Sequence, residues 1–85
     1  MYYVYLIVSN TSKRKWISYV GYTNDLKKRL TLHNNSKGAK FTRGKKWYLV
    51  YSKKYVKKSI AMKEEYKLKK DFNKRNKLKN SFLSK

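Results

Sequence analysis

The sequence predicts an α+β fold, in which a small three-stranded, mostly antiparallel sheet is flanked by helices. Three short runs rich in aromatic and β-branched residues have the length of strands, and two segments have the spacing of amphipathic helices. Their order along the chain is strand, strand, helix, strand, helix. A chain of 85 residues has room for one hydrophobic core, so we expect residues 1–85 to form a single domain.

The first two strands are expected to be antiparallel neighbours. Residues 2–8 (YYVYLIV) form a nearly continuous apolar run, which favours a strand buried on both faces. Residues 16–20 (WISYV) form a second run, and we expect Gly21 to end that strand. The polar segment between the two runs, residues 9–15, has the length and composition of a hairpin connection.

A helix is predicted from about residue 25 to residue 34. Thr23 or Asn24 is the expected N-cap, and Asp25 would stand in the first turn, where a negative charge is favourable. Residues 34–46 (NNSKGAKFTRGKK) mix Gly, Ser and Asn with basic residues, which indicates a surface loop able to bind phosphate. The expected nucleic-acid contacts of this loop are Lys37, Lys40, Arg43, Lys45 and Lys46.

The remainder of the chain predicts one more strand and a long helix. Residues 47–51 (WYLVY) form the third apolar run, and Ser59 is the expected cap of a helix that starts near Ile60. Lys-rich sequence continues to the end, and we expect residues 73–85 to be a basic C-terminal helix or tail.

Basic residues dominate the charge of the chain. Its net charge of +20 comes from 24 Lys and Arg against 4 acidic residues, and such an excess favours a polyanionic partner. The basic residues are spread along the chain rather than gathered on one amphipathic helix. This favours nucleic acid over an anionic membrane surface as the partner.

The absence of cysteine indicates a reducing, cytoplasmic setting, because neither a disulfide nor a thiolate zinc site can stabilise the fold. The apolar N-terminal run is only as long as a strand and has neither a preceding basic region nor a cleavage site, so we interpret it as a core strand. No apolar stretch approaches the roughly 20 residues of a membrane helix, and no membrane association is expected.

Any reaction centre must draw on few residues, since the acids are Asp25, Glu64, Glu65 and Asp71 and the one histidine is His33. A two-metal site needs several converging carboxylates, which this chain cannot easily supply. One Mg²⁺ held by a single carboxylate, water and a substrate phosphate is feasible, because Mg²⁺ keeps much of its water shell. Zinc hydrolysis is disfavoured by the lack of ligands.

Helical spacing places Arg29 and His33 on one face, beside Leu26 and Leu30, which should point at the sheet. Both polar groups would then lie near the edge of the core. The simpler interpretation is a surface cation and a solvated histidine near a helix C-terminus, and spacing alone favours that interpretation.

On the last helix, Ala61, Leu68 and Phe72 define an apolar stripe that Glu64 and Glu65 flank on opposite sides. Periodicity therefore predicts a carboxylate at the rim of the core without choosing between the two. Each glutamate has a structural alternative, an ion pair with a lysine one turn later.

Two tyrosine-rich strands carry a resemblance to a known family. Residues 3–5 (YVY) and 19–21 (YVG) resemble the paired motifs that name the GIY-YIG nucleases. Tyr3 stands where the first motif usually has Gly, and Val4 and Val20 stand where both motifs usually have Ile. These are strand positions rather than reacting groups.

The resemblance extends along nearly the whole chain. After the second motif the family carries a Thr, then a helix with an Arg and a His or Tyr four residues later, which Thr23, Arg29 and His33 match. Residues 61–70 (AMKEEYKLKK) resemble the metal-binding helix of small stand-alone members, in which the Glu falls four residues after the Ala. That register selects Glu65 over Glu64.

The resemblance implies a divalent-metal-dependent DNA endonuclease that hydrolyses phosphodiester bonds, with branched or distorted DNA as a substrate. Glu65 would bind one Mg²⁺ or Mn²⁺ ion and Tyr5 would help to activate water. Arg29 would steady the phosphate, and Tyr19 and His33 would support proton transfer. The family also carries an Asn beyond the metal-binding Glu, for which Asn73, Asn76 and Asn80 are candidates and Asn76 is our choice.

The alternative is a non-catalytic nucleic-acid-binding module on the same fold, in which the 37–46 loop and the Lys-rich C-terminal region contact phosphates. In either case we expect DNA as the partner, no membrane, no small-molecule cofactor, and a monomer or weak dimer.

Overall fold

The computed structural model describes residues 1–11 and 15–84, so part of the expected hairpin connection lies outside the described residues. The elements follow the chain in this order: β1 (Tyr2–Asn10), β2 (Trp16–Thr23), α1 (Leu26–Asn34), the short 3₁₀ helix η1 (Lys40–Thr42), β3 (Tyr48–Tyr55), α2 (Lys58–Lys70) and α3 (Phe72–Leu83). None of the helices in the described residues combines the length and the apolar composition that a membrane-spanning segment requires.

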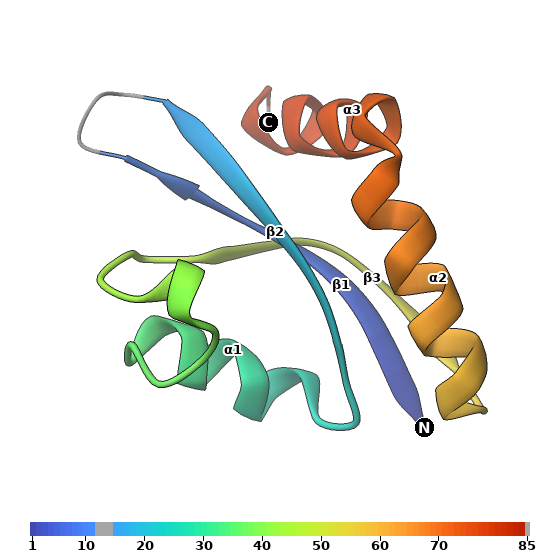
Figure 1. The fold of residues 1–85 in the computed structure, drawn as a ribbon. Coiled ribbons are helices and arrows are strands. Elements are labelled where there is room, and N and C mark those ends of the chain that lie inside the picture. The colour runs from blue at the N-terminus through green and yellow to red at the C-terminus, as the bar shows by residue number, and fades with distance from the viewer. Residues whose placement is uncertain (12–14, 85) are drawn as a thin grey trace.

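The three strands form one antiparallel sheet in the order β2-β1-β3, which confirms the predicted fold class. Tyr5 of the central strand lies opposite Gly21 of β2 and Ser52 of β3. A bulge interrupts the β1–β3 register between Leu6 and Ile7. Figure 1 shows α1 and η1 on one side of the sheet and α2 and α3 on the other.

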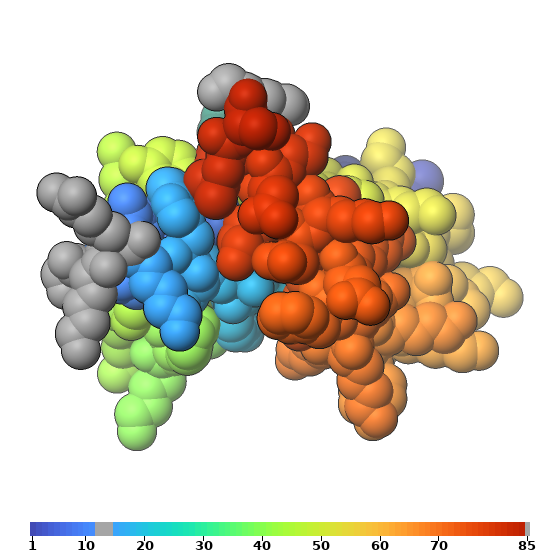
Figure 2. Space-filling view, turned by 90° about the horizontal axis from the view of Figure 1, so that it is seen from above, coloured from blue at the N-terminus to red at the C-terminus, as the bar shows by residue number. Residues whose placement is uncertain are grey.

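Both faces of β1 are buried because helices cover both sides of the sheet. Val4 and Leu6 pack with Ala61 and Leu68 of α2, whereas Tyr5 and neighbouring side chains pack with Trp47 on the α1 side. Alternation along one strand therefore sends successive side chains into two separate clusters. Figure 2 shows α3 beside the outer strand β2, to which Arg75 donates a hydrogen bond.

The junction of β2 and α1 differs from the expectation. Gly21 does not end the strand, which continues to Thr23. The N-cap of α1 is Asp25, because its carboxylate accepts from the backbone N–H of Lys28 at 3.1 Å. Thr23 is used elsewhere, since its hydroxyl oxygen accepts from the backbone N–H of Asp25 at 3.1 Å. Asn24 makes no cap.

The third strand is longer than predicted, and the next helix starts earlier. β3 continues past the expected range of 47–51 to Tyr55. α2 already begins at Lys58 after the N-cap residue Lys57, which makes no side-chain cap, so Ser59 lies in the first turn instead of capping it.

The expected apolar stripe on the last helix is wrong at its end. Ala61 and Leu68 are buried, but Phe72 is 65% exposed. The chain changes direction at Asp71, where α2 ends, and the Asp71 carboxylate caps α3 by accepting from the backbone N–H of Lys74 at 3.0 Å. Helical spacing therefore stops predicting the position of Phe72 at this break.

The fully buried Leu6 gives a direct test of the two-sided sheet. We expect Leu6→Ala to lower the free energy of unfolding by about 2–5 kcal/mol, because it leaves a cavity in the central strand. Urea unfolding followed by circular dichroism measures this change. Leu83→Ala, at a residue that is 37% exposed, is the control and should shift stability far less. Equal losses would contradict the assigned core.

Candidate active site

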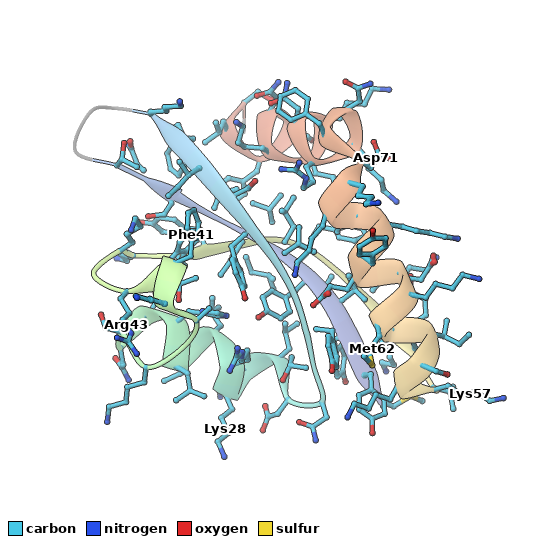
Figure 3. All side chains as sticks on the ribbon, in the orientation of Figure 1. Lys28, Phe41, Arg43, Lys57, Met62 and Asp71 are labelled. Atoms are coloured by element: carbon cyan, nitrogen blue, oxygen red, sulfur yellow. The ribbon has the colours of Figure 1, made fainter. Side chains whose placement is uncertain are left out.

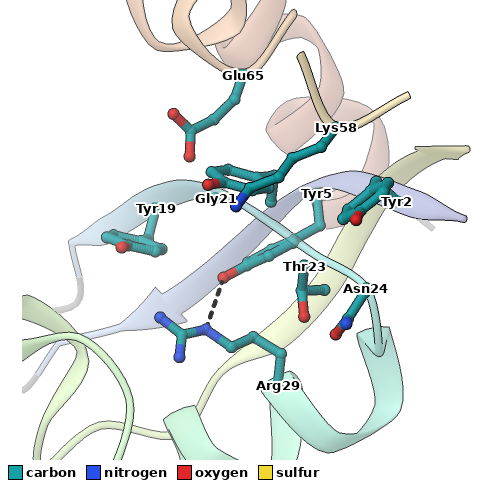
Figure 4. A pocket seen from close by; sticks show the side chains of 10 residues that line it. Tyr2, Tyr5, Tyr19, Gly21, Thr23, Asn24, Arg29, Lys58 and Glu65 are labelled. Carbon is teal, nitrogen blue, oxygen red and sulfur yellow. Dashed lines mark hydrogen bonds between the residues drawn. The ribbon is translucent and has the colours of Figure 1, made fainter. Parts of the chain in front are cut away.

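A cavity of about 380 Å³ opens beside β2, at the edge of the sheet. The residues that line it are Tyr2, Tyr5, Tyr19, Gly21, Tyr22, Thr23, Asn24, Arg29, Lys58 and Glu65. In Figure 4, Glu65 reaches the cavity from α2 and Arg29 reaches it from α1, with Tyr5 between them. Tyr5, Tyr19, Arg29 and Glu65, all expected at the reaction centre, thus line one cavity although they come from four elements.

Tyr5 occupies its place because Gly21 has no side chain. The two residues pair across β1 and β2, and a Cβ at position 21 would lie 2.6 Å from Cζ of Tyr5. The motif glycine is therefore required by the close approach of the tyrosine ring rather than by an unusual backbone angle. A glycine inside an otherwise aromatic and β-branched strand is the sequence signal for such an approach.

Arg29 contacts the same hydroxyl. Its Nε donates to the Tyr5 hydroxyl oxygen at 3.5 Å, and this hydrogen bond raises the pKa of Arg29. Burial nevertheless raises the pKa of Tyr5 above its ordinary value of 10.0, outweighing the hydrogen bond and charge of Arg29, which lower it. Tyr5 is therefore a neutral phenol at pH 7.

His33 lies behind Tyr5, outside the cavity lining. Contrary to the interpretation as a solvated residue, it is 0% exposed. Its Nε2 lies 2.8 Å from the Tyr5 hydroxyl and its Nδ1 lies 2.8 Å from the hydroxyl of Thr42. The ring of Tyr19 packs edge-on against it, with the ring centres 5.3 Å apart.

Thr42 determines which nitrogen of His33 carries the proton. The Thr42 hydroxyl donates its one hydrogen to the carbonyl of Ala39 at 2.8 Å, so it can only accept from His33. Nδ1 of His33 must then be the donor, which leaves the lone pair of Nε2 to accept from the Tyr5 hydroxyl. A directed chain of hydrogen bonds runs from Tyr5 through His33 and Thr42 to Ala39.

Sequence reasoning missed Thr42 and Gly38, which both hold the His33 ring. A Cβ at position 38 would lie 3.0 Å from Cγ of His33 and nearer still to Nδ1, so only glycine fits beside the ring. Both residues belong to the segment expected to be a surface loop. The glycine of this loop was the available signal, although nothing near it in sequence indicates that a histidine lies against it.

The two glutamates of α2 face different cavities. Glu65 lines the cavity that contains Tyr5, whereas Glu64 lines another one with Tyr55. Both expected ion pairs are present, Glu64 with Lys67 at 3.3 Å and Glu65 with Lys69 at 3.5 Å. Of the two carboxylates, only Glu65 therefore lies at the cavity of Tyr5 and Tyr19.

The donor set at this cavity suits one hard cation. In the described residues no group of three His, Cys, Asp or Glu side chains converges, and Glu65 is the one acidic residue that lines the cavity. Mg²⁺ accepts such a site, because it needs one or two carboxylates and takes its other ligands from water and phosphate. A zinc site would need more nitrogen or sulfur ligands.

The basic loop and Asn76 lie outside this cavity. Four of the expected phosphate contacts are exposed between α1 and β3: Lys37, Lys40, Arg43 and Lys46. Lys45 is half-buried, and its ammonium donates to the carbonyl of Phe41 at 3.3 Å. Asn76 lines a separate small cavity with Ser18 and Lys79, so the structure does not bring it together with Glu65.

The chain is similar to several known proteins. Residues 1–79 match the GIY-YIG catalytic domain. A UPF0213 protein of Oceanobacillus iheyensis is 52% identical over 52 residues, 60% of this chain and 60% of that relative, so less than two thirds of the relative is spanned. A UPF0213 protein of Staphylococcus haemolyticus is 37% identical over 79 residues, covering 92% and 90%. The solution NMR structure of a UPF0213 protein from Bacillus halodurans is 32% identical, covering 92% and 83%, with a TM-score of 0.45.

The buried His33 makes stability depend on pH. Burial, and then the charge of Arg29, lower the pKa of His33 from 6.5 to about 4. Between these two pH values the unfolded chain binds a proton that the folded chain does not, so stability falls as pH falls through this window. We expect a loss of up to about 3 kcal/mol, measured by urea unfolding.

His33→Gln is the control for that pH dependence. It removes the imidazole and keeps every carboxylate, so the loss of stability between pH 6.5 and about 4 should shrink in this variant.

A second prediction concerns the tautomer of His33. Nitrogen-15 NMR of the wild type should show the proton on Nδ1 at neutral pH, and Thr42→Val should weaken this preference because the acceptor is removed. An ordinary His33 titration near pH 6.5 would contradict the burial described here.

Proposed function

The chain belongs to the GIY-YIG catalytic domain family, which indicates a nuclease-type function, and on this premise we propose that it is a divalent-metal-dependent DNA endonuclease. The observation that carries the proposal is the single cavity in which Arg29 and Glu65, from opposite sides of the sheet, meet Tyr5 and Tyr19. A permanent cation, one carboxylate and phenol hydroxyls are suited to hydrolysis of a phosphodiester bond.

Glu65 is the residue that would hold the metal, one Mg²⁺ or Mn²⁺ ion, with water and the phosphate completing the shell. Such an ion supplies charge that offsets the negative charge growing on the phosphate during hydrolysis. Lys69 pairs with Glu65 at 3.5 Å and its side chain is exposed. The pair is open to solvent on its lysine side, where the Lys69 side chain is 50% exposed against 17% for Glu65, so Lys69 can release the carboxylate at low cost.

Arg29 is proposed to bind the scissile phosphate. Its guanidinium remains charged at every relevant pH and carries more donors than the one used on Tyr5. The donors that remain can contact phosphate oxygens while Nε keeps the side chain in place. This arrangement positions a cation before the substrate arrives, which is the condition for effective charge stabilisation.

Tyr5 and His33 are proposed to carry the proton away from the attacking water. The Tyr5 hydroxyl already donates to Nε2 of His33, so it can take a proton from water on the cavity side while it passes its own proton inward. A resting tyrosinate is disfavoured, because burial raises the pKa of Tyr5 and lowers that of His33. The two transfers should therefore be concerted. Because burial also disfavours a lasting imidazolium at His33, the proton would return along the same path through Tyr5 to the leaving oxygen or to solvent once the bond is broken. Tyr19 packs against the His33 ring and would hold it in place for both transfers.

Replacement of the cavity carboxylate separates this proposal from the binding-module alternative. We expect Glu65→Ala to reduce cleavage in Mg²⁺ by at least about 100-fold while DNA affinity stays close to wild type. A gel assay with single-stranded, duplex, flap and branched DNA measures cleavage, and fluorescence anisotropy measures affinity. Glu64→Ala is the matched control on the adjacent position and should remain active. A dead Glu64→Ala beside a live Glu65→Ala would show that the register is wrong.

Arg29→Ala should also reduce turnover by about 100-fold or more, since a charge directed at the phosphate is lost. Arg29→Lys should restore only part of the activity, because an ammonium cannot both hold Tyr5 and fork onto a phosphate. Single-turnover rates at saturating DNA measure the effect. Lys28→Ala, which removes an exposed cation from the same helix, is the control. If Lys28→Ala and Arg29→Ala lower the cleavage rate equally, Arg29 contributes only general electrostatic attraction for DNA.

A further inference from the structure

The short helix η1 presents one side chain to the core and the next to solvent. Thr42 is buried against His33, whereas Phe41 is 52% exposed. Phe41, labelled in Figure 3, stacks against Tyr19 with ring centres 6.1 Å apart and an angle of 21° between the planes. A large apolar ring is thus kept in the open beside a residue of the active-site cavity.

Phe41 forms one wall of a second cavity of about 280 Å³. Its lining residues are Ser18, Tyr19, Val20, Phe41, Lys69 and Arg75. Tyr19 also lines the active-site cavity, so the two cavities are neighbours across one ring. A polymer that places one unit in the first cavity has its next unit within reach of the second.

The second cavity has the charge of an anion site. Two cations and no acidic residue line it. Arg75 is held in place, because Nε donates to the carbonyl of Leu68 at 3.2 Å and one terminal nitrogen donates to the hydroxyl of Ser18 at 3.4 Å. Its other terminal nitrogen makes no hydrogen bond within the described residues. Lys69, the second cation of this cavity, is paired with Glu65 at 3.5 Å.

We propose that this second cavity binds one unpaired nucleotide next to the scissile phosphate. Its base would stack on Phe41 and its phosphate would contact Lys69 and Arg75. Aromatic rings accept any base by stacking, but a base inside a duplex has both faces covered by its neighbours. The inference rests on the proposed function and adds to it a requirement for an unpaired nucleotide beside the cut site.

Lys45 supports this assignment. Its ammonium lies over the Phe41 ring, 5.6 Å from the ring centre, so a base that stacks on that face would displace the ammonium and leave it beside the backbone of the bound nucleotide. The alternation of an aromatic ring with cations along a short path is the usual chemistry of single-strand binding. The net charge of +20 adds attraction for any DNA, whereas Phe41 would distinguish unpaired from paired DNA.

The test compares the affinity of Phe41 variants for two labelled DNAs of the same sequence, a flap and a blunt duplex, by fluorescence anisotropy in chelator. We expect Phe41→Ala and Phe41→Leu to weaken flap binding by about 5- to 100-fold while duplex binding is unchanged. Phe41→Trp should retain flap affinity. Phe41→Leu fills the same space without an aromatic face, and circular dichroism reports folding of each variant. The control is Tyr66→Ala, an aromatic residue of α2 that is 57% exposed and lines neither cavity.

Unchanged flap binding by Phe41→Leu, or equal losses on flap and duplex, would overturn the subsite. Because binding is measured in chelator, the result does not depend on turnover. If the wild type cleaves DNA and Phe41→Leu binds the flap normally, the endonuclease proposal stands and the subsite is wrong. Selective loss of flap binding in a protein that cleaves nothing would support the subsite and remove the endonuclease proposal. A wild-type protein with no affinity for either DNA would overturn both.

Discussion

The hydrogen bond from the Tyr5 hydroxyl to Nε2 of His33 is the interaction on which the rest of the site depends. It joins the central strand to α1 inside the core, where an unsatisfied phenol or imidazole would be strongly destabilising. The absence of side chains at Gly21 and Gly38 leaves room for the two rings. Once Tyr5 is fixed, the edge of the sheet beside it becomes the place where side chains from both faces can meet.

The position of that edge explains how opposite faces of the sheet contribute to one cavity. α1 and α2 cover different faces of the sheet, yet Arg29 and Glu65 reach around the outer strand β2. Gly21 keeps this strand free of a side chain at the crossing point. A phosphate in the cavity would lie between a permanent cation and the carboxylate suited to a metal, an arrangement that neither helix could build alone.

The four acidic residues have different structural roles. Asp25 and Asp71 cap α1 and α3, where their carboxylates satisfy backbone N–H groups. Glu64 pairs with a lysine away from the site, which leaves Glu65 as the one acid of the cavity. The chain carries 24 basic residues against 4 acidic ones, so the cavity carboxylate belongs to a strongly positive protein that attracts polyanions.

The sequence by itself determined the sheet, the order of the elements and the placement of Arg29 and His33 on the same helix face, because these follow from local periodicity. Family resemblance selected Glu65, and the tertiary structure places that residue, unlike Glu64, at the cavity lined by Tyr5 and Tyr19. The burial of His33 and its contact with Thr42 were decided only by folding. Periodicity reports which residues share a helix face. The position of the proton on His33 depends instead on the hydroxyl of Thr42, nine residues away in the sequence. The loop that brings Thr42 back to His33 has a composition that predicted only a surface segment.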